Sequence, residues 1–240
     1  PLCDVLYRME REGIAVDRPT LDAFGKMLAQ RIDDCEKLIY SYSEGPFNIN
    51  SPKQLGVLLF ETLGLPHGKK TKTGYSTNVE VLEKLKDKHP IIPAIMDYRM
   101  LTKLKSTYAD GLMKVIDTDG RVRTTFQNLV TATGRLSSTE PNLQNIPVRT
   151  DLGAEIRKMF VPKPGHVLVD ADYSQIELRV LAHIAADTVM QDAFKSGLDV
   201  HTVTAAQVFH VPFEEVTPLQ RRNAKAVNFG IVYGIGAHSL

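Results

Sequence analysis

The sequence has little cysteine, no long apolar run and almost no net charge. Its two cysteines, Cys3 and Cys35, match neither a metal-binding spacing nor a disulfide framework, which excludes a disulfide-stapled scaffold and favours a reducing compartment. No apolar run approaches the roughly 20 residues of a membrane-spanning helix, and the N-terminus lacks a signal-peptide pattern. With 240 residues, of which 43% are apolar, the chain has the composition of a globular protein with a large core.

A net charge of +1 excludes a wholly basic nucleic-acid binder, but the charge is unevenly distributed. Val216–Leu240 contains three Lys or Arg residues and no acid, and so does Pro66–Ser76. Small basic patches on a balanced chain are typical of phosphate contacts at a few chosen places. The alternative for either patch alone is an ordinary solvated surface.

Apolar residues recur at helical spacing through most of residues 1–115. The pattern then changes, because Arg121–Thr131 is rich in Val, Thr and Phe and predicts a strand, and the apolar run Val167–Asp172 predicts a buried strand. Further helices are predicted from Ser174 to about Ala186, from Val200 to Phe209 and from Pro218 onward. This order predicts an α+β protein with a helical region, a smaller β-containing region and a second helical region.

The most informative stretch is Thr217–Gly234, in which Arg221, Lys225, Phe229 and Tyr233 recur every four residues. On an α-helix this spacing forms one slanting stripe, cationic at its N-terminal end and aromatic at its C-terminal end. Cations near a helix N-terminus oppose the macrodipole, so the stripe does not serve the helix itself. It suits a ligand with a polyanionic tail and a flat ring, such as a nucleoside triphosphate. The alternative is a surface helix whose long cations snorkel.

A second candidate site is the predicted strand-to-helix junction DADYSQIELR, Asp170–Arg179. Asp170 and Asp172 are two apart and would share one face of the strand. A carboxylate that ends a buried strand is a natural Mg²⁺ ligand, because Mg²⁺ takes one or two carboxylates plus substrate phosphates. Ser174 and Glu177 have the spacing of a capping box, so a purely structural role for Glu177 stays open.

Two further helix starts are specified by local residues. Thr217 and Gln220 also have capping-box spacing, with Pro218 at the first helical position. Asp199 can cap the helix that holds His201 in its first turn, where backbone N–H groups favour an anion. A lone histidine is more often structural, so His201 is a weak signal by itself.

The segment Thr131–Thr150 is a polar loop that contains Arg135 and the amides Asn142 and Gln144. Arginine and amide side chains can donate to minor-groove acceptors, which are similar for every base pair. Such contacts would hold a duplex without reading its sequence. The alternative is a hydrogen-bonded loop that ties two elements together.

Three stretches of the chain resemble the signature motifs of family A DNA polymerases, and of the bacterial members most closely. They are DYSQIELR at Asp172–Arg179, RRNAKAVNFGIVYG at Arg221–Gly234, and TGRLSS with NLQNIP within Thr133–Pro147. The motifs occur in the family's order, and the likeness extends over the whole chain. The resemblance implies a right-hand architecture, with a helical thumb over residues 1–115, the first part of an antiparallel β palm over residues 116–186 and helical fingers over residues 187–240.

The resemblance also implies an activity, the template-directed transfer of a dNTP to a primer 3′-hydroxyl. It further implies a monomeric, cytoplasmic protein of bacterial or phage origin. Asp172 and the backbone carbonyl of Tyr173 would bind two catalytic Mg²⁺ ions. Arg221 and Lys225 would hold the triphosphate, with Lys225 a candidate proton donor to the leaving pyrophosphate. Glu177 would be a steric gate against a ribose 2′-hydroxyl. The remaining matched positions would contact the nucleotide (Gln175, His201, Phe229, Tyr233) or the primer–template duplex (Arg135, Asn142, Gln144).

The sequence departs from the family pattern at the second catalytic carboxylate, which the family has in a His-Asp-Glu turn. No His-Asp-Glu occurs in the chain, and a single aspartate is a poor two-metal site. We therefore expect a fragment that lacks the C-terminal part of the palm and any N-terminal exonuclease domain, and that does not extend a primer alone. Two alternatives stay open: a single-subunit RNA polymerase relative, which Glu177 and the NFGIVYG segment disfavour, and a non-catalytic primer–template-binding fragment.

Overall fold

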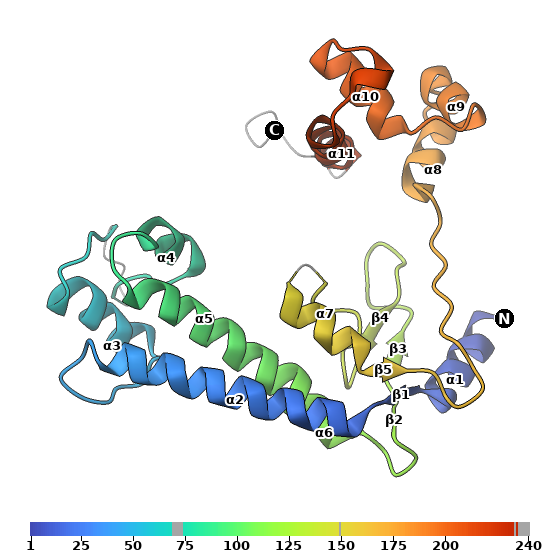
Figure 1. Cartoon of the computed structure of the whole chain (residues 1–240). Coiled ribbons are helices and arrows are strands. Elements are labelled where there is room, and N and C mark those ends of the chain that lie inside the picture. Colours follow the sequence, from blue (N-terminus) through green and yellow to red (C-terminus); the bar gives the residue numbers. More distant parts are fainter. Residues whose placement is uncertain (69–73, 149, 233, 235–240) are drawn as a thin grey trace. The chain divides into compact units, whose positions relative to one another are not determined.

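The chain folds into two units, Pro1–Leu168 and Val169–Leu240 (Figure 1). The structure is a computed structural model that describes residues 1–68, 74–148, 150–232 and 234. The predicted α+β class is confirmed, because helices dominate and two small antiparallel sheets lie in the first unit. The assignment of thumb, palm and fingers to residue ranges stays a prediction. Part of the basic segment Pro66–Ser76, including its three lysines, lies outside the described residues.

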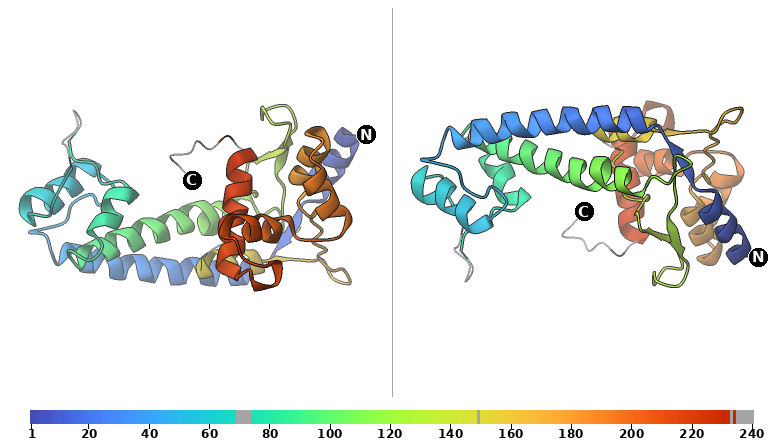
Figure 2. Two further views of the ribbon diagram at one scale, coloured as in Figure 1. Left: turned by 90° about the horizontal axis from the view of Figure 1, so that it is seen from above. Right: turned by 90° about the horizontal axis from the view of Figure 1, so that it is seen from below.

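The predicted helical region over residues 1–115 is confirmed except at Ile14–Val16, which forms a short strand. Side-chain oxygens of Asp17, Ser51 and Asn78 accept backbone N–H groups at three of the helix starts. Figures 1 and 2 show the long helices α2 and α5 side by side. The helical elements are α1 (Leu2–Glu12), α2 (Arg18–Tyr40), α3 (Pro52–Val57) with a π-helical turn (Leu58–Thr62), α4 (Val79–Leu85), α5 (Ile91–Leu104), a second π-helical turn (Lys105–Ala109) and α6 (Asp110–Val115).

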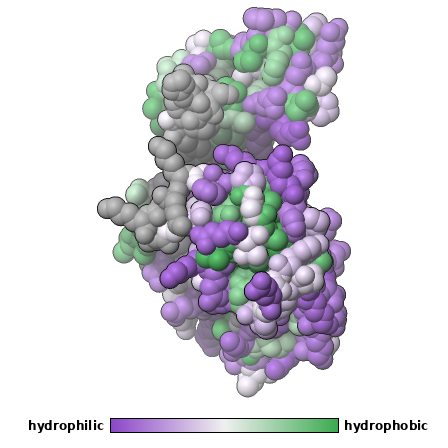
Figure 3. All heavy atoms as spheres, turned by 90° about the vertical axis from the view of Figure 1, so that its left-hand side faces the viewer, coloured by the Kyte–Doolittle hydropathy of each residue, from purple (hydrophilic) through white to green (hydrophobic). Residues whose placement is uncertain are grey.

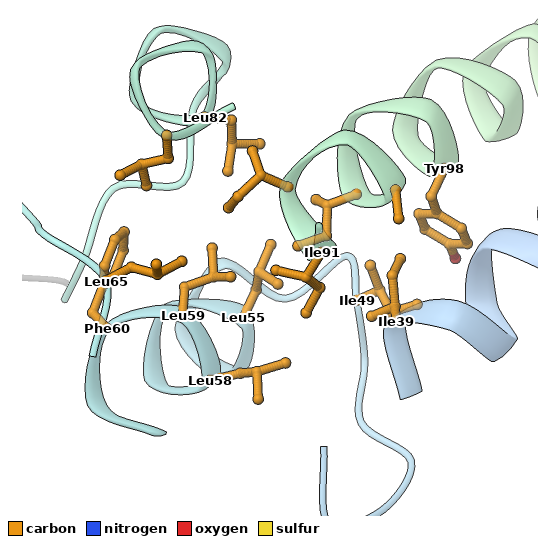
Figure 4. Close-up of a cluster of buried hydrophobic side chains, with 14 residues drawn as sticks. Ile39, Ile49, Leu55, Leu58, Leu59, Phe60, Leu65, Leu82, Ile91 and Tyr98 are labelled. Carbon is orange, nitrogen blue, oxygen red and sulfur yellow. The ribbon is translucent and has the colours of Figure 1, made fainter. Parts of the chain in front are cut away.

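One apolar cluster closes the end of the helical pair that is nearest α3 and α4. Figure 4 shows Leu55 and Leu59 from the α3 segment facing Leu82 of α4 and Ile91 of α5. All four side chains are fully or almost fully buried. Because burying one leucine or isoleucine side chain stabilises the fold by roughly 1.5–3 kcal/mol, this cluster fixes the short helices on the α2–α5 pair.

A second cluster joins the other end of the same helices to the sheets. Leu21 and Leu28 of α2 pack with Leu101 of α5 and with Ile156 of α7 (Asp151–Lys158). The three-stranded sheet has the order β2-β1-β5, with β1 (Ile14–Val16) central between β2 (Arg121–Val122) and β5 (Phe160–Val161), and the second sheet pairs β3 (Thr125–Gln127) with β4 (Ser137–Thr139).

The predicted strand Arg121–Thr131 is only partly correct. It is divided between the two sheets at Thr124, whose buried hydroxyl bonds to Ser138 Oγ (2.6 Å) and to the Pro141 carbonyl (2.8 Å). The residues after Gln127 form a loop instead of a strand. The side-chain bonds of one threonine thus redirect the chain from one sheet to the next.

The predicted buried strand Val167–Asp172 is wrong. This segment has no regular secondary structure, and Val167 and Val169 are 79% and 83% exposed. A strand is stable only when a neighbour pairs with its backbone groups, and no strand of the described residues pairs with this one. The apolar run predicted burial, but burial depends on a partner that periodicity does not reveal.

The second unit is a small helical cluster. Its core contains Leu178, Ala193 and Val200, with Met190 and Phe194 packed against them. Asp187 and Asp199 cap α9 and α10 as the first residue before each helix. The helices are α8 (Ile176–Ile184), α9 (Thr188–Lys195), α10 (Val200–Phe209) and α11 (Pro218–Val232), with a 3₁₀ turn at Phe213–Glu215.

Hydrophilic and apolar residues are interspersed on the face of the molecule shown in Figure 3. Over the described part of the chain, no helix combines the length and the apolar character that crossing a bilayer requires. Both cysteines are free thiols, Cys3 exposed and Cys35 half-buried.

Replacing Gly153 by alanine is expected to lower the free energy of unfolding by about 1–2 kcal/mol. A Cβ at this position of α7 would lie 2.6 Å from Pro147 Cβ and 2.8 Å from the Pro147 carbonyl oxygen, so the loop before α7 would have to move. This strain exceeds the gain of up to about 1 kcal/mol in helix propensity. Urea unfolding measures the difference. Gly45→Ala is the matched control, because its Cβ would meet nothing within 4 Å, and equal unfolding midpoints for the two variants would contradict the expectation.

Candidate functional site

A cavity of about 440 Å³ in the second unit brings together two sequence segments that the motifs single out. One is the junction before α8, and the other is the exposed side of α11. Figure 1 shows α11 next to α10, which contributes a third wall. The lining residues are Asp172, Tyr173, Ser174, Gln175, Ile176, Glu177, His201, Arg221, Lys225 and Phe229.

Helix α11 begins where the sequence predicts, because its capping box forms. Gln220 N–H donates to Thr217 Oγ1 (3.3 Å), and Thr217 N–H donates to Gln220 Oε1 (2.9 Å). Ala224 is 1% exposed and lies on the packed side of the helix. The capping box therefore fixes the register of the cationic stripe relative to the helix start.

Three members of the predicted stripe, Arg221, Lys225 and Phe229, line the cavity together. Lys225 Nζ lies 5.9 Å from the centre of the Phe229 ring, within the range of a cation–π contact. The fourth member, Tyr233, lies outside the described residues. The cavity thus has cations at one end and an aromatic ring further along α11.

The junction before α8 differs from its prediction. Helix α8 starts after Gln175, whose backbone is left-handed (φ 54°, ψ 39°), and no side chain caps it. The predicted capping box of Ser174 and Glu177 is wrong, because Ser174 lies one residue too early. Its carbonyl instead accepts a bond from Arg179 Nε (2.9 Å), and Glu177 lines the cavity.

Asp199 accepts hydrogen bonds from each of the three segments that line the cavity. As predicted, it caps α10, accepting from Thr202 N–H (2.9 Å) at Oδ2. Arg221 donates to the same carboxylate twice, from Nε to Oδ2 (2.8 Å) and from Nη2 to Oδ1 (3.0 Å), and Gln175 Nε2 donates to Oδ1 (2.9 Å). Burial alone would raise the pKa of Asp199, but the hydrogen bonds from Arg221, Thr202 and Gln175 hold it far below its usual range. The carboxylate is therefore ionised at neutral pH.

His201 is only 2% exposed and is held against α11. Asn228 Nδ2 lies 3.1 Å from His201 Nδ1 and 3.0 Å from Thr204 Oγ1, and the His201 and Phe229 ring centres are 5.7 Å apart. Burial lowers the pKa of His201, although Asp199 opposes the shift. The Asn228 amide nitrogen can only donate, so His201 Nδ1 accepts this bond. These contacts of His201 with Asn228 and Phe229 help to orient α11 on α10.

The residues that line the cavity can bind an anion and can supply some of the ligands of a cation. Arg221 and Lys225 supply positive charge, and Asp172 supplies carboxylate oxygens, with Tyr173 beside it in the lining. Within the described ranges, no three His, Cys, Asp or Glu side chains gather as a metal site. These donors fit a Mg²⁺ ion only where substrate phosphates complete its shell, which is the mode that Mg²⁺ prefers.

The predicted duplex contacts Arg135, Asn142 and Gln144 lie in the first unit. Asn142 Oδ1 accepts from the backbone N–H groups of Gln144 (2.9 Å) and Asn145 (3.3 Å), and Gln144 Nε2 donates to the Leu136 carbonyl (3.1 Å). Both amides therefore also shape their own loop, as the structural alternative predicts. Contact with nucleic acid stays a prediction for these residues.

The contacts that two residues near the cavity make between helices were not predicted from the sequence. Asn228 carries no motif signal, because its partners His201 and Thr204 are on another helix. Asp199 was predicted as a helix cap, but its bonds to Arg221 and Gln175 connect residues that are 22 and 24 positions away. A sequence pattern limited to one helix does not reveal such pairs.

The chain is similar to known proteins over its whole length. A family model described as DNA polymerase family A matches residues 18–240. The chain is 58% identical to DNA polymerase I of Caldicellulosiruptor bescii over 241 aligned positions and 54% identical to DNA polymerase I of Bacillus subtilis over 242. Each alignment covers 100% of this chain but only 28% of the relative. A solved structure, the POL domain of Pol1 from M. smegmatis in complex with DNA primer-template and dNTP, is similar with a TM-score of 0.83 and 44% identity, covering 97% of this chain and 41% of that one.

Proposed function

Because the chain belongs to DNA polymerase family A, we propose that it is part of a template-directed DNA polymerase that transfers a dNTP to a primer 3′-hydroxyl. The observation that supports this function is the cavity that joins Asp172 to Arg221, Lys225 and Phe229. Two motifs about 50 residues apart in sequence line one site. Such convergence is expected of a substrate site and not of two independent surface features.

The triphosphate binds at the cationic end of α11. Arg221 lines the cavity with N–H donors that suit phosphate oxygens, and Lys225 supplies a second charge one helical turn later. Lys225 is also the candidate proton donor to the leaving pyrophosphate. Phe229 lies beside the sugar and Tyr233 near the nascent base pair, and Gln175 and His201 complete the wall. Glu177 acts as a steric gate against a ribose 2′-hydroxyl.

Asp172 and the Tyr173 carbonyl would hold divalent metal, with the substrate phosphates as further ligands. Bound Mg²⁺ supplies charge neutralisation and polarises phosphate oxygens during phosphoryl transfer. The protein's own contribution is to position the reactants and to place fixed charges around them. Holding two ions would require a second carboxylate in addition to Asp172.

The first unit contacts the duplex product. Arg135, Asn142 and Gln144 provide donors for minor-groove acceptors, which are common to all base pairs. A helical thumb would span residues 1–115, the first part of a palm residues 116–186, and fingers residues 187–240, in keeping with the order of helices and strands. The similar structure from M. smegmatis contains primer-template DNA and dNTP, which supports a primer–template duplex as the partner.

Primer extension by the complete polymerase that contains this segment tests the function. We expect extension with dNTPs and a decrease of at least about 10²-fold in incorporation efficiency with rNTPs, because a steric gate leaves no room for the 2′-hydroxyl. Equal use of both nucleotides would favour the RNA polymerase alternative. Residues 1–240 alone are expected to give no extended product, and templated synthesis by them would contradict the need for a second carboxylate.

A further inference from the structure

The Asp199 carboxylate accepts five hydrogen bonds from three different segments of the second unit. Thr202 donates its backbone N–H and its hydroxyl (2.6 Å), Gln175 donates from the junction before α8, and Arg221 donates twice from α11. Capping α10 requires only the Thr202 N–H bond. The remaining partners both line the nucleotide cavity, so this carboxylate does more than start a helix.

The contrast with Asp187 supports a separate role. Asp187 caps α9 in the same unit by accepting from Met190 N–H (3.0 Å), and it lies outside the walls of the nucleotide cavity. Both residues are aspartates at the N-cap of a short helix, with the same backbone conformation. Only Asp199 places its second oxygen toward a residue of the proposed triphosphate site.

The hydrogen bond from Gln175 to Asp199 is accompanied by two unfavourable features of Gln175 in the described part of the chain, a left-handed backbone and an unpaired buried oxygen. This indicates that the fold specifies the bond. Gln175 has a left-handed backbone, unfavourable for a residue with a Cβ. Its Oε1 is buried and has no hydrogen-bond partner among the described residues, while its Nε2 bonds to Asp199. The bond to Asp199 therefore helps to hold the strained turn that presents Asp172 and the Tyr173 carbonyl.

We infer that Asp199 is a positioning residue for nucleotide binding, which fixes the guanidinium of Arg221 toward the cavity and ties it to the Gln175 turn. The inference rests on the proposed function and adds a residue that does not itself touch the substrate. The bidentate pair uses two of the five guanidinium N–H groups, which leaves three for phosphate oxygens. Without Asp199, the half-exposed Arg221 side chain would sample several rotamers, and ordering it would reduce nucleotide affinity.

The experiment uses Asp199→Asn in the complete polymerase, measured by single-turnover incorporation. Asparagine caps helices as well as aspartate does, so α10 is kept, but its amide cannot accept both Arg221 bonds. We expect the apparent Kd for dNTP to rise about tenfold, which corresponds to the loss of one charge-assisted hydrogen bond. The Kd for primer–template should not change. Tripolyphosphate, a competitor with no base or sugar, should show a similar rise in its inhibition constant.

Asp187→Asn is the matched control, and it should leave both constants unchanged. A double variant with Arg221→Ala should show a defect smaller than the product of the two single defects, because both changes remove the same contact. The inference would be overturned if Asp199→Asn bound dNTP like the wild type while Arg221→Ala did not, or if Asp187→Asn showed the same defect. A wild-type enzyme that incorporates no dNTP would overturn the proposed function as well, so the two failures are distinguishable.

Discussion

Primer extension is expected to fall by at least about 10³-fold when Asp172 is replaced by alanine in the complete polymerase, since the metal's contribution to the transition state is several kcal/mol. Asp172 lines the same cavity as Arg221 and Lys225 of α11, next to Tyr173 in the chain. Removing it leaves the cavity without the carboxylate that is proposed to hold divalent metal. Binding of primer–template should remain within about twofold of wild type, because its duplex contacts lie elsewhere in the chain.

The control for this prediction is Asp170→Ala. Asp170 lies two residues earlier in the same exposed segment, but it is not among the residues that line the cavity. A general loss of local charge would affect both variants alike, whereas a metal site depends on Asp172 alone. Single-turnover rates and a gel-shift with the same duplex separate these cases. Substantial extension by Asp172→Ala would remove the basis of the metal assignment.

The efficiency of nucleotide incorporation is expected to fall by about 10²–10³-fold in Lys225→Ala, the usual effect of removing one donor that stabilises transition-state charge. Lys225 lies one helical turn after Arg221 and, with Phe229, lines the same cavity. Because the side chain both attracts the triphosphate and can protonate the leaving group, the maximal rate should fall and the apparent KM for dNTP should rise.

Lys195→Ala provides the matched control. Lys195 is an exposed lysine of α9 in the same unit, 3.5 Å from Asp192, and it does not line the cavity. Its replacement should change neither constant, because exposed ion pairs contribute little. A Lys225→Ala enzyme with wild-type rate and KM would show that the stripe on α11 does not grip a nucleotide.

Features set by neighbouring residues were predictable from the sequence. The starts of α10 and α11 follow from Asp199 and from the Thr217–Gln220 capping box, and both form as expected. The spacing of Arg221, Lys225 and Phe229 correctly placed the three side chains on one wall of a cavity. These signals act within about one helical turn, so no knowledge of the rest of the fold is needed.

Features that depend on distant partners were not predictable. The apolar run Val167–Asp172 suggested a buried strand, yet it is exposed because no described strand pairs with it. Ser174 and Glu177 matched a capping box, yet the left-handed Gln175 delays the helix by one residue. In both cases a local pattern was compatible with two conformations, and tertiary contacts selected the other one.

The sequence by itself determined the α+β class, the helical regions and the stripe of charged and aromatic residues on α11, because these features depend on spacing and capping within single elements. The tertiary structure places Asp172 and this stripe on one cavity, and it alone decided that Asp199 links Arg221 to the turn at Gln175. The physical reason is range: a hydrogen bond between residues 22 positions apart exists only after the helices that carry them have packed.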